Sequence, residues 1–79
     1  MTPIIKDVKV LENYELLLIY ENGEEKIYDM KPNLQYECFS KLKDYKYFKK
    51  VHACGETIEW EEGEDVCPED MYFNSKKVK

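Results

Sequence analysis

The sequence predicts an α+β domain, with a small antiparallel sheet of about five strands and short helices on one face. Two observations support this prediction. Residues 4–30 contain three strand-like segments with a hairpin signal, and beyond Pro32 the apolar residues recur at a helical spacing. With 79 residues the chain is long enough for one domain. We expect that domain to span residues 1–75, followed by a frayed basic tail at residues 76–79.

The first three segments predict a three-stranded meander. Residues 4–10 alternate between apolar and polar, and residues 15–20 and 25–30 are separated by Asn22-Gly23. Asn-Gly is a strong hairpin signal because a type I′ turn needs positive φ at both of its central residues. Residues 15–20 are apolar on both faces, which indicates a strand covered on both sides, or covered on one side by a partner chain.

Short helices are predicted after the meander. Phe39, Leu42, Tyr45 and Phe48 recur every three residues, a spacing too short for one straight α-helix. We therefore expect two helical pieces at about residues 35–43 and 45–50, with Asp44 capping the second.

A second hairpin and a short C-terminal helix complete the predicted fold. Residues 51–54 and 57–62 flank Gly55, and Cys67-Pro68 is typical of a helix start, because proline favours the first helical position. The residues expected to point inward are Leu16, Leu18, Phe39, Leu42, Phe48, Ile58 and Trp60.

Charge is unevenly distributed along the chain. All 12 basic residues are lysine, and 17 acidic residues give a net charge of −5. Residues 41–50 hold five lysines and one aspartate, whereas residues 51–75 hold eight acidic residues and no lysine. An acidic stretch of this kind favours a basic partner over nucleic acid. The candidate interface residues are Glu59, Glu61, Glu62, Glu64 and Asp65, with Leu17 and Ile19 from the two-sided apolar strand.

Catalytic patterns are missing from the sequence. Ser40 and Ser75 have no neighbouring base in the chain, and the three glycines are too far apart to form a phosphate-binding loop. We expect no enzymatic activity and no cofactor.

The three cysteines, Cys38, Cys54 and Cys67, are expected to be reduced thiols. His52, Cys54 and Cys67 lack the close cysteine pair of a structural zinc site, so no metal is predicted. We expect a half-buried strand histidine and two small core residues instead. Four carboxylates around Cys67 disfavour its thiolate, which predicts an unreactive thiol.

Several strings resemble a bacterial family, the domain-of-unknown-function family 2442 (DUF2442). They are "YELLLIYENGEEKIYDMKP" at 14–32, "TIEWEEGEDVCPEDMY" at 57–72, and the spaced Phe39–Leu42 and Phe48–Val51 between them. Met71 replaces the usual leucine of the family pattern, and Glu62 replaces its common asparagine. The positions that match the pattern are Asp29, Pro32, Phe39, Leu42, Phe48, Trp60, Gly63, Asp65, Pro68 and Tyr72.

This resemblance implies the same small α+β fold and assigns no activity or site residue. It also implies a genomic context, since members are often encoded beside another small protein and some carry a fused helix-turn-helix. That arrangement is similar to toxin–antitoxin pairs.

The functional prediction is therefore a small, non-enzymatic protein-interaction module that restrains a basic neighbour-encoded protein in an antitoxin-like manner. Formation of a homodimer is a further possibility that the sequence allows. The alternative is a nucleic-acid-associated accessory protein that uses the Lys41–Lys50 face, which the absence of arginine and the net charge disfavour. Lysines and aspartate within residues 1–10, and the short apolar runs elsewhere, predict a cytoplasmic protein without a membrane segment.

Overall fold

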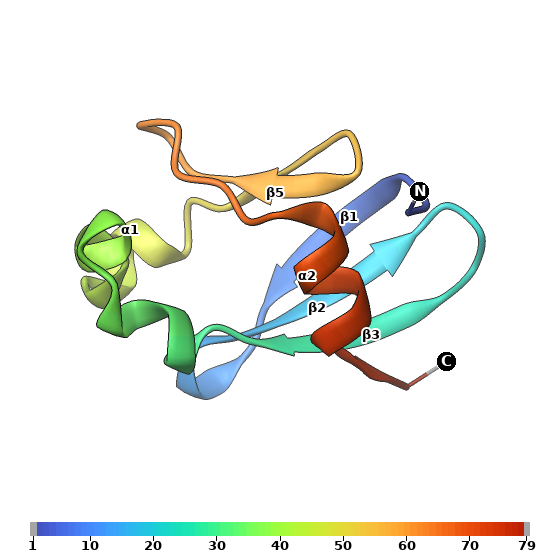
Figure 1. Cartoon of the computed structure of the whole chain (residues 1–79), viewed down its shortest axis with the longest axis horizontal. Helices are drawn as coiled ribbons and strands as arrows, with labels where there is room; N and C mark the ends of the chain where they lie inside the picture. The colour runs from blue at the N-terminus through green and yellow to red at the C-terminus, as the bar shows by residue number, and fades with distance from the viewer. Residues whose placement is uncertain (1, 79) are drawn as a thin grey trace.

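The computed structural model describes residues 2–78. Its main element is an antiparallel sheet with the strand order β1-β2-β3-β6 (Figure 1). These strands are β1 (Ile5–Val10), β2 (Glu15–Tyr20), β3 (Glu25–Asp29) and β6 (Lys76–Lys77). The first three form the predicted meander, so both the α+β class and the meander are confirmed.

The second hairpin forms a sheet of its own. It consists of β4 (His52–Cys54) and β5 (Thr57–Glu59), which pair with each other and not with the main sheet. The expected sheet of about five strands is thus four strands plus a separate pair. The hairpin lies beside β1, where the Ile5 N–H donates to the Gly55 carbonyl at 2.9 Å.

One face of the main sheet carries the core. Helix α2 (Pro68–Asn74) crosses in front of this face, and the second hairpin lies on the same side (Figure 1). Of the seven residues predicted to point inward, six are fully buried, and Phe39 is partly buried against them. The buried apolar residues are Ile5, Leu16, Leu18, Tyr20, Tyr28, Met30, Leu42, Phe48, Ile58, Trp60, Val66 and Met71.

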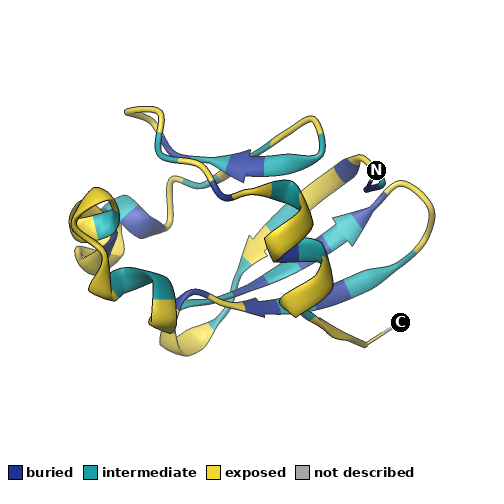
Figure 2. Cartoon of the chain, viewed as in Figure 1, coloured by how far each residue is buried: buried dark blue, intermediate teal, exposed yellow. Residues whose placement is uncertain are grey.

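Strand β2 has two different faces. Leu16, Leu18 and Tyr20 alternate into the core, whereas Leu17 and Ile19 lie on the opposite face and are half-buried. The burial colours accordingly alternate along β2 in Figure 2. Neither Leu17 nor Ile19 belongs to the residues packed against the core. Strand β2 therefore carries two apolar residues, Leu17 and Ile19, that are not part of the core.

The helical region is mostly 3-10 helix. Its elements are η2 (Lys31–Gln35), η3 (Glu37–Lys43) and α1 (Tyr45–Phe48). A 3-10 helix has three residues per turn, which is the spacing seen in the sequence. The Asp44 carboxylate accepts a hydrogen bond of 3.1 Å from the Lys46 N–H, so the predicted cap is confirmed.

The expected basic tail is paired with β3 in the part that the structure describes. Helix α2 ends at Asn74. Lys76 and Lys77 form β6, in which Lys76 pairs with Ile27 and Lys77 pairs with Lys26 of β3. The Val78 N–H continues this pairing by donating to the Glu25 carbonyl at 2.8 Å. Residue 79 lies outside the described part of the chain.

The first hairpin turn is not of type I′. The Gly23 N–H donates to the Tyr20 carbonyl at 3.1 Å, and the Tyr20 N–H donates to the Glu24 carbonyl at 2.9 Å. Gly23 has φ of 94°, whereas Asn22 is not among the residues with positive φ. The loop therefore has three residues, with a type I turn followed by glycine.

Candidate functional site: an acidic groove

The acidic residues gather at a second turn of the same kind, at residues 60–64. The Trp60 N–H donates to the Glu64 carbonyl at 2.8 Å, and the Gly63 N–H donates to the Trp60 carbonyl at 2.9 Å. Gly63 has φ of 98°. A bridge between Asp65 and Glu59, the last residue of β5, pairs the two sides of this turn. The turn therefore reverses the chain with glycine at the one position that needs positive φ.

Helix α1 holds this turn in place. The Trp60 indole Nε1 donates to the buried Phe48 carbonyl at 2.8 Å. The Tyr47 hydroxyl donates to the Glu64 carboxylate at 2.6 Å and accepts from the Glu62 N–H at 2.9 Å. Desolvation and, next, the bond to Glu64 raise the pKa of Tyr47 above its ordinary value of 10.0. The phenol thus stays protonated and able to donate to Glu64.

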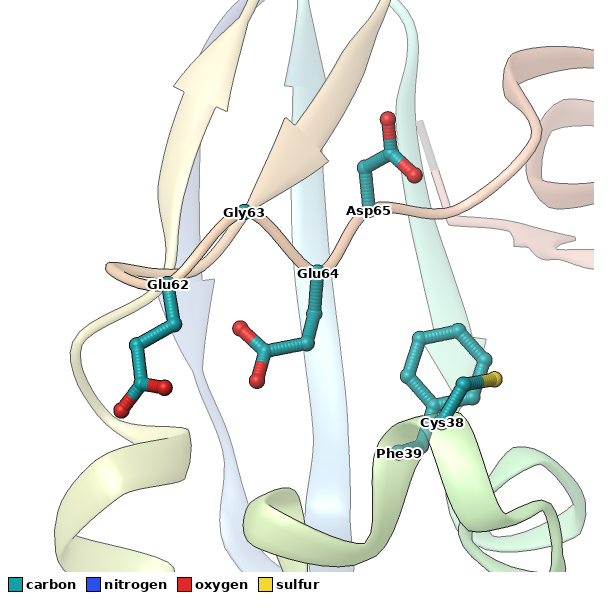
Figure 3. Close-up of a pocket in the computed structure, with 6 residues that line it drawn as sticks. All are labelled: Cys38, Phe39, Glu62, Gly63, Glu64 and Asp65. Atoms are coloured by element: carbon teal, nitrogen blue, oxygen red, sulfur yellow. The ribbon is translucent and has the colours of Figure 1, made fainter.

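A groove of about 370 Å³ separates this turn from η3 (Figure 3). Cys38 and Phe39 of η3 form one wall, and the turn forms the other. Glu62 and Glu64 point toward the η3 side, whereas the Asp65 side chain points to the opposite side of the loop (Figure 3). The groove thus combines one aromatic ring with two carboxylates.

The fold brings the lysine-rich segment against these acids. Lys41 pairs with Glu62, and the Lys50 ammonium lies 3.2 Å from the Glu61 carboxylate. The hydrogen bond to Glu62 raises the pKa of Lys41 above its ordinary value. Both pairs are more than half exposed, and exposed pairs contribute little to stability because water and salt screen them. Loss of either ion pair should therefore cost the fold little stability.

Comparison with protein families identifies the family of this chain. The family model described as "Protein of unknown function (DUF2442)" matches residues 5–77. The chain belongs to the DUF2442 family. The resemblance seen in the sequence is thus confirmed over nearly the whole chain. No curated protein and no solved structure gives a significant match.

The structure separates the two groups of predicted interface residues of this DUF2442 protein. The acids lie at the end of β5 and in the following turn, on the side of the sheet that holds the core. Leu17 and Ile19 lie on the other face of the sheet. A single small partner segment in the groove would not reach both groups.

Sequence reasoning missed two contributors to the groove. Phe39 was expected to be a core residue but is half-buried and lines the groove. Tyr47, which bonds to Glu62 and Glu64, was considered only as part of a nucleic-acid surface. Its place among the five lysines of residues 41–50 was the signal in the sequence, and that signal pointed to nucleic acid. Its actual partners, Glu62 and Glu64, are distant in sequence.

The thiols of the DUF2442 chain differ from the prediction. Cys54 and Cys67 are exposed, so they are not core residues, and the His52 side chain is 51% exposed with Nε2 3.1 Å from Glu59. Cys67 does precede α2 as its N-cap residue, with Pro68 first in the helix, as expected. Within residues 2–78, no three His, Cys, Asp or Glu side chains are placed to hold a metal ion. No helix in that range is long and apolar enough to cross a membrane.

Proposed function

We propose that this protein is a non-enzymatic interaction module whose acidic groove binds a basic segment of another protein. The observation that supports the proposal is the placement of Glu62 and Glu64 beside Phe39 in one groove. A lysine or arginine side chain has an apolar stem and a cationic end, so it complements an aromatic wall with carboxylates beside it.

The charge around the groove favours such a partner. Glu59, Glu61, Glu62, Glu64 and Asp65 supply five carboxylates, and Lys41 and Lys50 supply two ammonium groups, which leaves a local charge of −3 with His52 neutral. A field of this sign speeds the approach of a cationic partner more than it strengthens the final complex. The binding we propose is therefore rapid and sensitive to salt.

The finer proposal concerns the partner's identity. We propose a small basic protein encoded by a neighbouring gene, which this bacterial, cytoplasmic DUF2442 protein restrains in the manner of an antitoxin. The alternative, nucleic-acid binding through Lys41–Lys50, is weakened by the pairing of two of its five lysines with Glu61 and Glu62.

Affinity capture from host lysate, followed by mass spectrometry, tests the proposal. Three baits are compared: the wild type, Glu61→Lys/Glu62→Lys, and the control Glu12→Lys/Glu21→Lys. The control makes the same change in net charge at two exposed residues, Glu12 in the short 3-10 helix before β2 and Glu21 in the turn after it. Wild type and control should retain one basic protein that the groove variant loses, and retention should fall as salt rises.

Two results would contradict the proposal. One is capture of nothing at low salt, and the other is equal retention by all three baits. Recovery of nucleic acid that depends on Lys46 and Lys49 would favour the alternative instead.

A further inference from the structure

The face of the main sheet opposite α2 carries two cross-strand rows of residues, here called the open face. Direct pairing places Lys9, Leu17, Ile27 and Lys76 in the first row. The second row, two residues along each strand, contains Asp7, Ile19, Glu25 and Val78. The centre of each row is apolar, the first row ends in lysine on both sides, and the second row carries two carboxylates.

We propose that the open face packs against the open face of a second copy of this chain. The two-fold axis would run across the strands, between the two rows. Each strand then lies over the same strand of the second copy, but the first row of one copy faces the second row of the other. Two sheets stacked in this way lie about 10 Å apart, with strands within about 30° of each other.

Charge complementarity selects this arrangement. On β1, Lys9 of each copy faces Asp7 of the other, so one contact occurs twice by symmetry. On β6, Lys76 lies over Val78 of the second copy, one strand away from its Glu25. An axis parallel to the strands would instead place Lys9 over Lys76 and set like charges against each other.

The apolar residues of the open face also favour a second copy of this chain as the partner. With this axis, Leu17 faces Ile19 of the second copy, again twice, at the centre of the contact. Val78, which is 53% exposed in the single chain, becomes covered by the lysine stem above it.

On β3, Ile27 faces Glu25 of the second copy, which leaves that carboxylate within reach of Lys76 on the neighbouring strand. A partner with one uniform charge would match one row and oppose the other, whereas a second copy sets Lys9 against Asp7 in both directions.

The acidic groove takes no part in this contact, so the inference stands apart from the proposed function. Glu61 and Glu62 lie in the turn after β5, on the side of the sheet that holds the core. The variant Glu61→Lys/Glu62→Lys should therefore lose the basic partner and keep the dimer. A failure of one proposal leaves the other unaffected.

Sedimentation velocity across a range of protein concentrations is the test, with circular dichroism to confirm folding. Wild type should form a dimer. Lys9→Glu sets two carboxylates against each other at both symmetric contacts, and its dimer dissociation constant should rise at least about tenfold. The double variant Asp7→Lys/Lys9→Glu exchanges the two charges and should return to within about threefold of the wild type.

Two further variants define the surface. Leu17→Lys introduces a charge at the centre of the contact and should give a folded monomer, because Leu17 is outside the core. Lys46→Glu on α1 makes the same charge change as Lys9→Glu and should leave the dimer intact.

A wild type that stays monomeric at every concentration would overturn the inference, and the open face would then be left for a different protein. A dimer that is indifferent to Leu17→Lys, or that Asp7→Lys/Lys9→Glu fails to restore, would also overturn it, because the copies would be meeting elsewhere.

Discussion

The Tyr72 hydroxyl donates a hydrogen bond of 2.5 Å to the Glu24 carboxylate, which ties the C-terminal helix to the first hairpin turn. The two residues are 48 positions apart in the chain. Beneath them, the Lys26 ammonium lies 3.9 Å from the centre of the Tyr72 ring and bonds to the Tyr72 carbonyl at the end of α2. A cation is favoured there because the helix dipole is negative at its C-terminus.

This contact predicts a dependence of stability on acid. The bond from Tyr72 and, next, the bond from Asn22 hold the pKa of Glu24 below its ordinary value of 4.5. A carboxyl whose pKa is lower in the folded state contributes stability that is complete above pH 4.5 and is lost as pH falls through the folded value. Tyr72→Phe removes the largest cause of that shift.

We therefore expect wild type to lose more stability than Tyr72→Phe between about pH 6 and about pH 3, where the carboxyl is protonated. Urea unfolding followed by circular dichroism measures the difference. Tyr36→Phe, at an exposed tyrosine, is the control and should follow the wild type. Parallel curves for wild type and Tyr72→Phe would contradict this assignment.

Tyr20 predicts a second dependence, at alkaline pH. Its side chain is buried, its hydroxyl has no hydrogen-bond partner among the described residues, and burial raises its pKa to about 12. Above pH 10.0 the unfolded chain releases this proton while the folded chain keeps it. Stability should therefore fall from pH 10 toward pH 12.

Tyr20→Phe should flatten that alkaline loss. At neutral pH it should raise the free energy of unfolding by roughly 1 kcal/mol, because the buried hydroxyl no longer needs to be desolvated. At neutral pH Tyr28→Phe is the matched control and should not gain stability, since the Tyr28 hydroxyl has a partner in Asn33 at 3.4 Å. A clear loss of stability in Tyr20→Phe at neutral pH would mean that the hydroxyl has a partner after all.

Trp60→Phe tests how the acidic turn is anchored. The change keeps an aromatic ring but leaves the buried Phe48 carbonyl without the indole donor. The Phe48 carbonyl still accepts from the Val51 N–H at 3.3 Å, so the change removes one hydrogen bond without leaving the acceptor unpaired. The free energy of unfolding should therefore fall by roughly 0.5–1.5 kcal/mol. Chemical denaturation gives the value. The exposed substitution Phe73→Leu should change it by less than about 0.5 kcal/mol.

Gly63 predicts a purely conformational cost. A Cβ atom at this position would meet nothing within 4 Å, so replacement creates no steric contact, yet φ of 98° is unfavourable for L-residues. Gly63→Ala should destabilise the fold by about 1–2 kcal/mol, and Gly63→Asn by less, because asparagine adopts positive φ more readily. Thermal unfolding should show that order, and equal melting temperatures for all three proteins would refute the strain.

The local parts of the fold could be predicted from sequence. Asn22-Gly23 correctly marked the chain reversal, but the dipeptide does not fix the number of loop residues, so the turn type was wrong. The three-residue spacing of Phe39 and Leu42 correctly excluded one long α-helix, and 3-10 geometry explains it. These features depend on neighbours in the chain.

The parts that could not be predicted depend on contacts between distant segments. Lys76 and Lys77 have no apolar pattern, and they become β6 only because α2 delivers the chain to the edge of β3. At the groove, composition indicated the acids, but the clamp by Tyr47 and the ion pair between Lys41 and Glu62 require η3 and α1 to fold against the turn. The spacing of residues along the chain does not indicate that packing.

Strand β6 has a consequence for how this protein avoids aggregation. An unpaired strand edge can template edge-to-edge growth with other chains, and natural sheets block it with short edge strands and lysine. At the edge beyond β3, β6 is short and consists of two lysines, so it meets both conditions. At the edge formed by β1, the Ile5 N–H already donates a hydrogen bond to the Gly55 carbonyl. Addition of further strands is thus discouraged at both edges of the sheet. Contacts between copies would then form through the faces of the sheet, and a face-to-face pair is a closed assembly that cannot grow further.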